Sequence, residues 1–198
     1  MTSLVPRLLI GILVFDEVEL LDFAGPYEVL TGTLGPDGLP YADVVTIGPT
    51  TEVRARGGLR LLPAHTVDDC PPLDALIVPG GPGADDRTAV QDERLLPFLR
   101  ERAAITPLIA SVCTGAFLLG RAGLLDGLEV TTNLHAIDAL AAEVPATRVV
   151  GGKVVDAGAI VTAGGVSSGI DLALHLMGRW FGDEARRRAA SGLEGPWS

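Results

Sequence analysis

Short apolar stretches alternate along the chain with segments of helical pattern. The stretches at 8–15, 75–78 and 108–112 are hydrophobic at nearly every position, which is typical of strands covered on both faces. A further strand is predicted at 42–47, and helices are expected around 27–30, over 94–102, after residue 113, and in a last segment with apolar residues at i, i+3, i+4 and i+7: Ile170, Ala173, Leu174 and Met177. The alternation predicts an α/β fold, a three-layer αβα sandwich around a mostly parallel sheet.

Two antiparallel hairpins are predicted at the edges of this sheet. One joins 53–55 to 59–62 through Arg56-Gly57-Gly58, and the other joins 148–150 to 153–155 through Gly151-Gly152. A two-residue turn of this kind favours glycine because its backbone adopts positive φ. Helix boundaries are expected at Pro26, as the start of the first helix, and near Ser167 or Ser168, as the cap of the last.

Composition limits the classes of protein to consider. The 198 residues, 47% of them hydrophobic, are enough for one domain, 1–198, with a sizeable core. Fifteen basic and 25 acidic residues give a net charge of −10, so nucleic acid is not an expected partner, and the run Arg186–Arg188 is expected on a solvated helix face or a subunit contact. The apolar stretch 8–15 is too short to span a bilayer, and no membrane association is expected. A cytoplasmic location follows as a prediction.

The pentapeptide Ser111-Val112-Cys113-Thr114-Gly115 directly follows a buried strand and predicts a nucleophile elbow. Small residues on either side of the turn let strand and helix approach closely, which leaves Cys113 at the carboxyl end of the sheet, where ligands of α/β proteins bind. The N–H groups of the following helix would favour a thiolate. The alternative is that Cys113 is a small buried hydrophobic side chain.

Three further features could serve such a nucleophile. Asp22 stands among apolar residues, and burial would raise its pKa so that a neutral carboxyl group could share a proton with the thiol; the alternative is an ordinary helix-capping aspartate. His135 is the one histidine that follows a predicted strand, which makes it a candidate base. Gly80 and Gly81 end another buried strand, where their N–H groups could face a developing negative charge or form a tight turn.

Neither a metal nor a cofactor is expected. The two cysteines and three histidines lack the spacing of metal ligands, and no glycine-rich segment matches a nucleotide-binding motif. Cys70 lies in a loop and is interpreted as structural, with no disulfide to Cys113.

The chain resembles the ThiJ/PfpI superfamily, whose fold is flavodoxin-like and related to the class I glutamine amidotransferases. The resembling segments extend over nearly the whole chain: 21–30, 69–74, 78–81, 111–115, 122–127, 131–132 and 161–171. Within the superfamily, Asp22 together with Cys113-Thr114-Gly115 resembles the members that hydrate isonitriles and the amino-terminal domains of some AraC-type regulators.

The resemblance implies a small electrophilic substrate, a homodimer and a role for each site residue. Cys113 would attack the isonitrile carbon to form a thioimidate, Asp22 would protonate that carbon and activate the water that releases an N-substituted formamide, and Thr114, Gly80 and Gly81 would complete the pocket. Where related sequences carry Thr-Thr-His-Trp, this chain has Thr131-Thr132-Asn133-Leu134. Asn133 therefore replaces the usual histidine and is a candidate substrate ligand, with His135 two residues further on.

Two other functions stay open. One is different cysteine chemistry of the superfamily, of glyoxalase, deglycase, amidase or protease type, which the replacement of the histidine by Asn133 disfavours. The other is a non-enzymatic redox or ligand sensor, because a reactive thiol at Cys113 would serve a sensor equally well.

Overall fold

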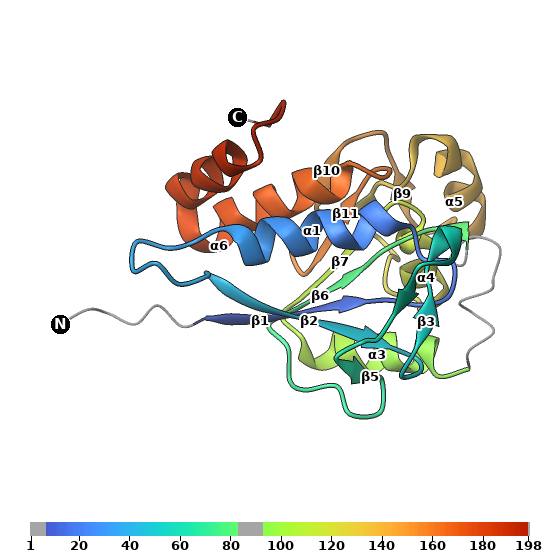
Figure 1. Ribbon diagram of the computed structural model, residues 1–198. Helices are drawn as coiled ribbons and strands as arrows, with labels where there is room; N and C mark the ends of the chain where they lie inside the picture. Colours follow the sequence, from blue (N-terminus) through green and yellow to red (C-terminus); the bar gives the residue numbers. More distant parts are fainter. Residues whose placement is uncertain (1–6, 83–92, 198) are drawn as a thin grey trace.

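A central seven-stranded sheet organises the computed structural model, which describes residues 7–82 and 93–197. The strand order is β10-β11-β7-β6-β1-β2-β5, and every neighbouring pair is parallel except β10 with β11 (Figure 1). The strands are β1 Leu8–Leu13, β2 Ala42–Gly48, β5 His65–Thr66, β6 Ala75–Val78, β7 Leu108–Val112, β10 Val154–Asp156 and β11 Ile160–Ala163.

Helices cover both faces of this sheet. In Figure 1, α1 (Leu20–Gly32) and α6 (Ser168–Gly192) lie side by side above the sheet and α3 (Leu95–Ile105) lies below it. Helix α4 (Gly115–Arg121) contacts both α3 and α5 (Ile137–Glu143). The predicted α/β fold, with a mostly parallel sheet between helical layers, is confirmed.

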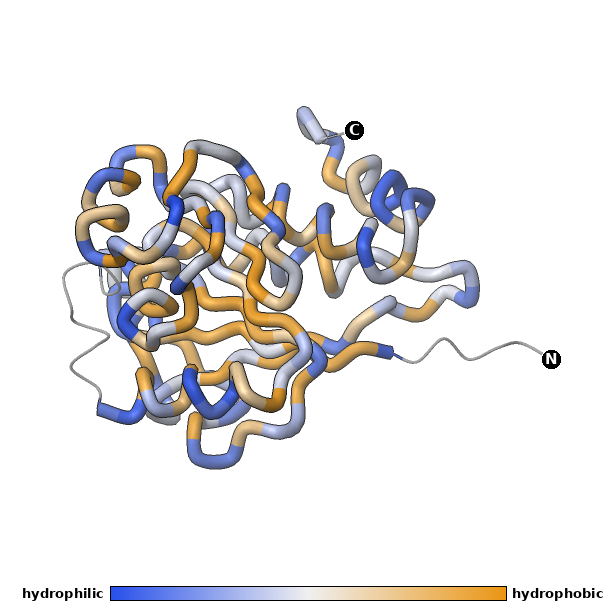
Figure 2. The backbone as a smooth tube through the Cα atoms, turned by 180° about the vertical axis from the view of Figure 1, so that it is seen from behind, coloured by the Kyte–Doolittle hydropathy of each residue, from blue (hydrophilic) through white to orange (hydrophobic). Residues whose placement is uncertain are grey.

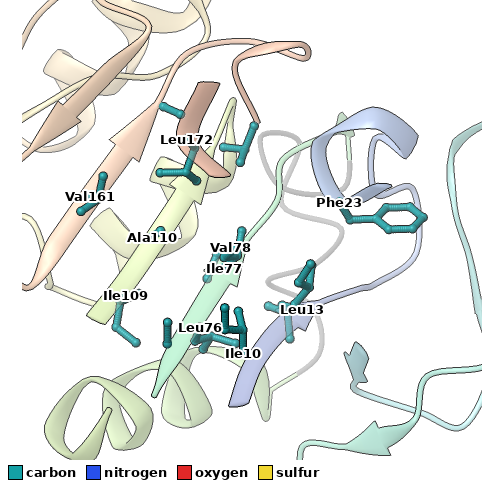
Figure 3. Packing of buried hydrophobic residues seen from close by; sticks show 14 of the residues in the cluster. Ile10, Leu13, Phe23, Leu76, Ile77, Val78, Ile109, Ala110, Val161 and Leu172 are labelled. Atoms are coloured by element: carbon teal, nitrogen blue, oxygen red, sulfur yellow. The ribbon is translucent and has the colours of Figure 1, made fainter. Parts of the chain in front are cut away.

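The core lies where the continuous apolar stretches of the sequence predicted it. Strands β6 and β7 are buried along their whole length, and the side chains of Ile10, Leu76 and Ile109 come together across three neighbouring strands (Figure 3). Hydrophobic residues follow the strands through the centre of the molecule, whereas loops and outer helix surfaces are more hydrophilic (Figure 2). Within 7–82 and 93–197, no helix is both long enough and apolar enough to cross a bilayer.

The first predicted hairpin forms, but not as part of the main sheet. Strands β3 (Val53–Arg54) and β4 (Arg60–Leu61) pair antiparallel around a 3-10 turn at Arg56–Gly58 and make a separate two-stranded sheet. The loop after β1 holds this hairpin through backbone groups: Glu17 N–H donates to Arg54 O over 2.7 Å, and Arg56 N–H donates to Val18 O over 3.0 Å. These bonds give backbone groups of the hairpin hydrogen-bond partners in the loop after β1, so the hairpin does not need to pair with the edge of the main sheet.

The second predicted hairpin, which joined 148–150 to 153–155, does not form, so this prediction is wrong. Strand β9 (Arg148–Val149) pairs parallel with β8 (Glu129–Val130), while β10 pairs with β11 through a turn at Gly158, whose φ is 91°. Gly158 N–H also donates to Asp156 Oδ1 over 2.9 Å. The left-handed turn therefore forms at Gly158, and neither Gly151 nor Gly152 has a positive φ.

The first helix begins earlier than Pro26 predicted. Helix α1 starts at Leu20 and contains Pro26 in its interior, where proline removes one helical hydrogen bond. A Cβ atom placed on Gly169 would lie 3.0 Å from Pro26 Cδ, so the proline ring packs closely against the start of α6. The close packing of the two helices offsets the lost bond. Helix α6 begins at Ser168 with Ser167 at the N-cap position, as predicted, but the Ser167 side chain makes no capping hydrogen bond. Arg186–Arg188 are exposed on this helix.

Substitution of Gly115 by alanine tests the tightest contact in the fold. A Cβ atom there would lie 2.1 Å from Val78 O and 2.7 Å from Pro79 O, both backbone atoms that cannot move aside. We expect Gly115→Ala to lower the free energy of unfolding by about 3 kcal/mol, measured by urea denaturation.

Gly32→Ala is the matched control, because a Cβ atom at this helical glycine would meet nothing closer than Glu28 Oε1 at 3.4 Å. Alanine there should change stability by less than about 1 kcal/mol, in the stabilising direction. Equal stability of both variants would contradict the close-contact argument.

Candidate active site

Cys113 occupies the sharp turn between β7 and α4 that the sequence predicted. Its φ is 56°, a left-handed conformation that is unusual for a residue with a side chain, and 5% of its surface is exposed. The peptide is held on both sides: Cys113 N–H faces Ala163 O at 3.0 Å and Gly164 O at 2.9 Å, and Thr132 Oγ1 donates to Cys113 O over 2.8 Å. These contacts hold the strained turn in place.

Asp22 lies in the first turn of α1 and is completely buried. Its Oδ2 accepts the N–H of Gly80 over 3.0 Å, while Oδ1 has no hydrogen-bond partner within the described residues. The thiol of Cys113 lies close enough to the carboxyl group to affect its pKa. Asp22 is therefore a neighbour of Cys113, and its side chain does not cap the helix.

Burial raises the pKa of Asp22 from 3.8 to about 7. Desolvation is the largest cause, and the negative charge of Glu19 adds to it, while hydrogen bonds from Gly80 N–H and Cys113 act in the opposite direction. At neutral pH the carboxyl group can therefore both release and accept a proton.

The pKa of Cys113 is also raised, chiefly by burial and then by the charge of Asp22. Hydrogen bonds from Asn133 and from the backbone N–H groups of Val166 and Thr114 lower it, but less strongly. The prediction of a thiolate stabilised by the helix is therefore wrong for the site as a whole. Helix α4 has only seven residues, and the desolvation of the sulfur outweighs its N-terminal N–H groups.

Thr114, Gly80 and Gly81 join the elbow to the loop after β6. Thr114 Oγ1 accepts the N–H of Gly81 over 2.9 Å and lies 3.2 Å from Gly81 O, to which it donates. A Cβ atom on Gly80 would lie 2.5 Å from Thr114 N, so only glycine fits. The N–H groups of both glycines already have partners, Asp22 and Thr114, and in this arrangement they position site residues.

Asn133 contacts the sulfur, whereas His135 does not. Asn133 Nδ2 donates to Cys113 Sγ over 3.4 Å, and Asn133 Oδ1 accepts the N–H of His135 over 2.9 Å, which sets the orientation of the amide. His135 is exposed in the 3-10 turn Leu134–Ala136, and no hydrogen bond joins its ring to any described residue. The structure thus brings together Cys113, Asp22, Thr114, Gly80, Gly81 and Asn133, and leaves His135 at the rim.

A cavity of about 620 Å³ opens beside this cluster. Asn133 and Val166, which both contact the sulfur, belong to its wall. The described lining residues are Thr132, Asn133, Leu134, His135, Ile137, Gly152, Lys153, Gly164, Gly165, Val166 and Ser168.

Sequence reasoning missed the loop after β11 as part of the site. A Cβ atom on Gly165 would lie 2.5 Å from Asn133 Nδ2, and Val166 has a φ of 38° that turns its backbone N–H toward the sulfur. The available signal was a strand followed by Gly164-Gly165, the same pattern as 75–78 followed by Gly80-Gly81. The sequence did not reveal that β11 pairs parallel with β7, which places the loop after β11 beside the turn that carries Cys113.

Comparison with known proteins assigns the chain to a family. The model of the DJ-1/PfpI family matches residues 9–179. The chain belongs to this family. The predicted ThiJ/PfpI resemblance is therefore confirmed.

Relatives within the family include an enzyme and a regulator. The chain is 40% identical over 172 residues to isonitrile hydratase from Pseudomonas putida, an alignment that covers 84% of this chain and 69% of the hydratase. It is 30% identical over 180 residues to the HTH-type transcriptional regulator GbdR from Pseudomonas aeruginosa, covering 88% of this chain and 47% of the regulator. A ThiJ/PfpI family protein from Pseudomonas syringae has a similar structure, with a TM-score of 0.85, 29% identity and coverage of 96% of this chain and 76% of the other.

Beyond this cluster, the described part of this DJ-1/PfpI member contains no group of three His, Cys, Asp or Glu side chains that could hold a metal ion. Both cysteines are free. Cys70 lies outside the site, half-buried, with its sulfur 3.5 Å from Pro71 O.

The raised pKa of Asp22 predicts how the stability of the protein depends on pH. Between its unfolded value near 3.8 and its folded value of about 7, the folded chain binds more protons than the unfolded chain. The free energy of unfolding should therefore fall as pH rises through this window, by about 1.4 kcal/mol for each pH unit of the shift at most. Above the window the destabilisation is complete and constant.

Urea denaturation of the native protein and of Asp22→Asn at several pH values from about 4 to about 8 measures this effect. The variant lacks the titrating group, so its stability relative to the native protein should rise with pH and level off above about pH 7. A constant difference between the two proteins across the range would contradict the assignment.

Proposed function

We propose that this DJ-1/PfpI protein is an enzyme that adds water to an isonitrile and releases an N-substituted formamide. The observation that carries the proposal is the buried pair of Cys113 thiol and Asp22 carboxyl group, with Asp22 near pKa 7 and no histidine ring bonded to the sulfur. The 40% identity to isonitrile hydratase supports the same chemistry.

In the first step, Cys113 adds across the isonitrile carbon. The thiol passes its proton to Asp22, the sulfur forms a bond to carbon, and the electron pair left on carbon takes the proton back from Asp22. The product is the thioimidate R–N=CH–S–Cys113, which contains all atoms of the isonitrile and the thiol. Because the proton must end on carbon, a buried carboxyl group with a pKa of about 7 suits the step as both acceptor and donor.

In the second step, water adds to the thioimidate carbon. The Asp22 carboxylate removes a proton from the water and passes it to the imine nitrogen as the water oxygen bonds to carbon, which gives the tetrahedral adduct R–NH–CH(OH)–S–Cys113. The adduct collapses when the carbon–sulfur bond breaks and Asp22 carries the hydroxyl proton to the departing sulfur, so that R–NH–CHO and the free Cys113 thiol are released. Asn133, which donates to this sulfur over 3.4 Å, supports the departing thiolate. Gly80 N–H keeps the Asp22 carboxyl group oriented through both steps.

Two observations weigh against the other functions. Glyoxalase, deglycase, amidase or protease chemistry of the histidine-dependent kind lacks its base here, because Asn133 occupies the position beside the sulfur and His135 is exposed. Redox sensing favours an accessible thiol of low pKa, whereas Cys113 is 5% exposed and its pKa is raised by burial. The similarity to the regulator GbdR extends over 47% of that protein and is lower, at 30% identity, than the similarity to isonitrile hydratase.

We further propose that residues 1–198 form one domain, that the protein lies in the cytoplasm and that it assembles as a homodimer. The homodimer rests on the resemblance to the family. Sedimentation equilibrium at micromolar concentration should give twice the mass of one chain, and a single-chain mass would contradict it.

Turnover of an alkyl and an aryl isonitrile by the purified protein tests the activity. Formamide, followed by mass spectrometry, should form with the native protein and disappear in Cys113→Ala. Asp22→Asn should lower kcat by about 10²- to 10⁴-fold, since it removes a general acid–base group.

Cys70→Ala is the matched control, because Cys70 lies outside the site and its loss should leave turnover unchanged. Circular dichroism of each variant checks folding. Formamide production that persists in Cys113→Ala, or its absence with every isonitrile, would contradict the proposed activity.

A further inference from the structure

We propose that the natural substrate carries an anionic group, such as a carboxylate, and that Lys153 binds it at the far side of the cavity beside Cys113. The inference rests on the proposed function in one respect, namely that the reacting group of the substrate is an isonitrile. The charge preference is a property of the cavity itself and can be measured without that reaction.

The cavity adjoins Cys113. Asn133 and Val166 line it, and both also contact the sulfur of Cys113 through Asn133 Nδ2 and Val166 N–H. These two residues therefore stand between the cavity and the sulfur, and in the proposal the reactive end of a ligand lies on their side of the cavity.

The described lining of this cavity contains a lysine, Lys153, and no aspartate or glutamate. The whole chain has a net charge of −10, so a cavity without acidic side chains differs from the average surface of the protein. A basic cavity in an acidic protein selects for anionic ligands, which the rest of the surface repels.

The backbone of Lys153 is hydrogen-bonded to the loop after β11, whereas its side chain extends into solvent. Lys153 O accepts the N–H of Gly164, the residue next to the Asn133-facing Gly165, over 3.0 Å. The Lys153 side chain is 75% exposed, whereas that of Asp171 is 17% exposed, and Lys153 Nζ lies 3.1 Å from Asp171 Oδ1. Because most of the lysine side chain faces solvent, an incoming carboxylate can bind the ammonium group alongside Asp171.

Other charges near Lys153 belong to a neighbouring cavity of about 380 Å³ that also includes Lys153 in its wall. Asp171, His175 and Arg186 line that second cavity and not the first. His175 is engaged with Asp156 at 2.7 Å, and Arg186 lies 3.8 Å from Asp183. Lys153 is thus the cation common to both cavities.

Apolar side chains line the cavity as well. Leu134 and Ile137 belong to its wall, and Leu134 is 72% exposed, so its side chain is available to a ligand in the cavity. A substrate with an isonitrile at one end, an apolar middle and a carboxylate at the other matches the sulfur, these side chains and Lys153.

Alkylation of Cys113 measures how strongly the charge of Lys153 attracts an anion that approaches the sulfur. Iodoacetate and iodoacetamide place the same carbon on the sulfur but differ in charge, and Cys70 in the same chain is an internal reference. The ratio of the iodoacetate rate to the iodoacetamide rate at Cys113, read by peptide mass spectrometry, should fall about 3- to 10-fold in Lys153→Met. Arg148→Met removes an equal charge from a residue that pairs with Glu129 outside the cavity, and it should leave the ratio unchanged.

Matched isonitriles, one with a carboxylate and one with its methyl ester, provide the second measurement. The native protein should prefer the carboxylate in kcat/KM through a lower KM, and Lys153→Met should lose that preference while it still hydrates the ester. Equal rates for both substrates, with no effect of Lys153→Met on the alkylation ratio, would overturn the inference and leave the hydratase activity standing.

Failure of the proposed function gives a different pattern. A Lys153-dependent alkylation ratio without hydration of any isonitrile would support the anion site and reject the hydratase activity. No reaction of Cys113 with either alkylating reagent, together with no hydration, would overturn both proposals.

Discussion

The turn from β7 into α4 packs directly against the end of β6, with no room for a side chain between them. Gly115 lies against the carbonyl groups of Val78 and Pro79, and Gly80 lies against the backbone of Thr114. This close approach brings the Cys113 sulfur and the β6 loop to the same point. The β6 loop in turn donates Gly80 N–H to Asp22 Oδ2 over 3.0 Å, so the position of the carboxyl group depends on the same contact.

Once the two groups are held together and buried, their protonation is coupled. Desolvation raises the pKa of both Asp22 and Cys113, and the negative charge of Asp22 makes ionisation of the Cys113 thiol less favourable still. The hydrogen bond from Asn133 lowers the pKa of Cys113 and so opposes part of this rise, although an amide does not act as an acid or base. The reaction proposed for this site needs one proton to move between sulfur, carboxyl group and substrate, and no histidine takes part in that proposal.

Three loops surround the pair of Cys113 and Asp22. Loops after β6, β7 and β11 meet at one edge of the sheet because these strands are neighbours and parallel. The β11 loop, Gly164 to Val166, forms one wall of the cavity and approaches both Asn133 and the sulfur. Through the bond from Gly164 N–H to Lys153 O, the same loop also connects the nucleophile to the basic side of the cavity.

The sequence by itself determined the features that depend on local pattern. Continuous apolar stretches predicted β1, β6 and β7, and the small residues around Cys113 predicted the elbow, because both signals lie within a few neighbouring residues. Only the tertiary structure decided the partner of β10, the start of α1 ahead of Pro26, and the engagement of Gly80 and Gly81 N–H with Asp22 and Thr114. It also decided that Asn133 and not His135 contacts the sulfur. The β10–β11 hairpin joins strands that are close in the chain, and its turn falls at Gly158 rather than at Gly151-Gly152. The other features depend on residues far apart in the chain, whose distance is set by the order of strands and by burial rather than by local composition.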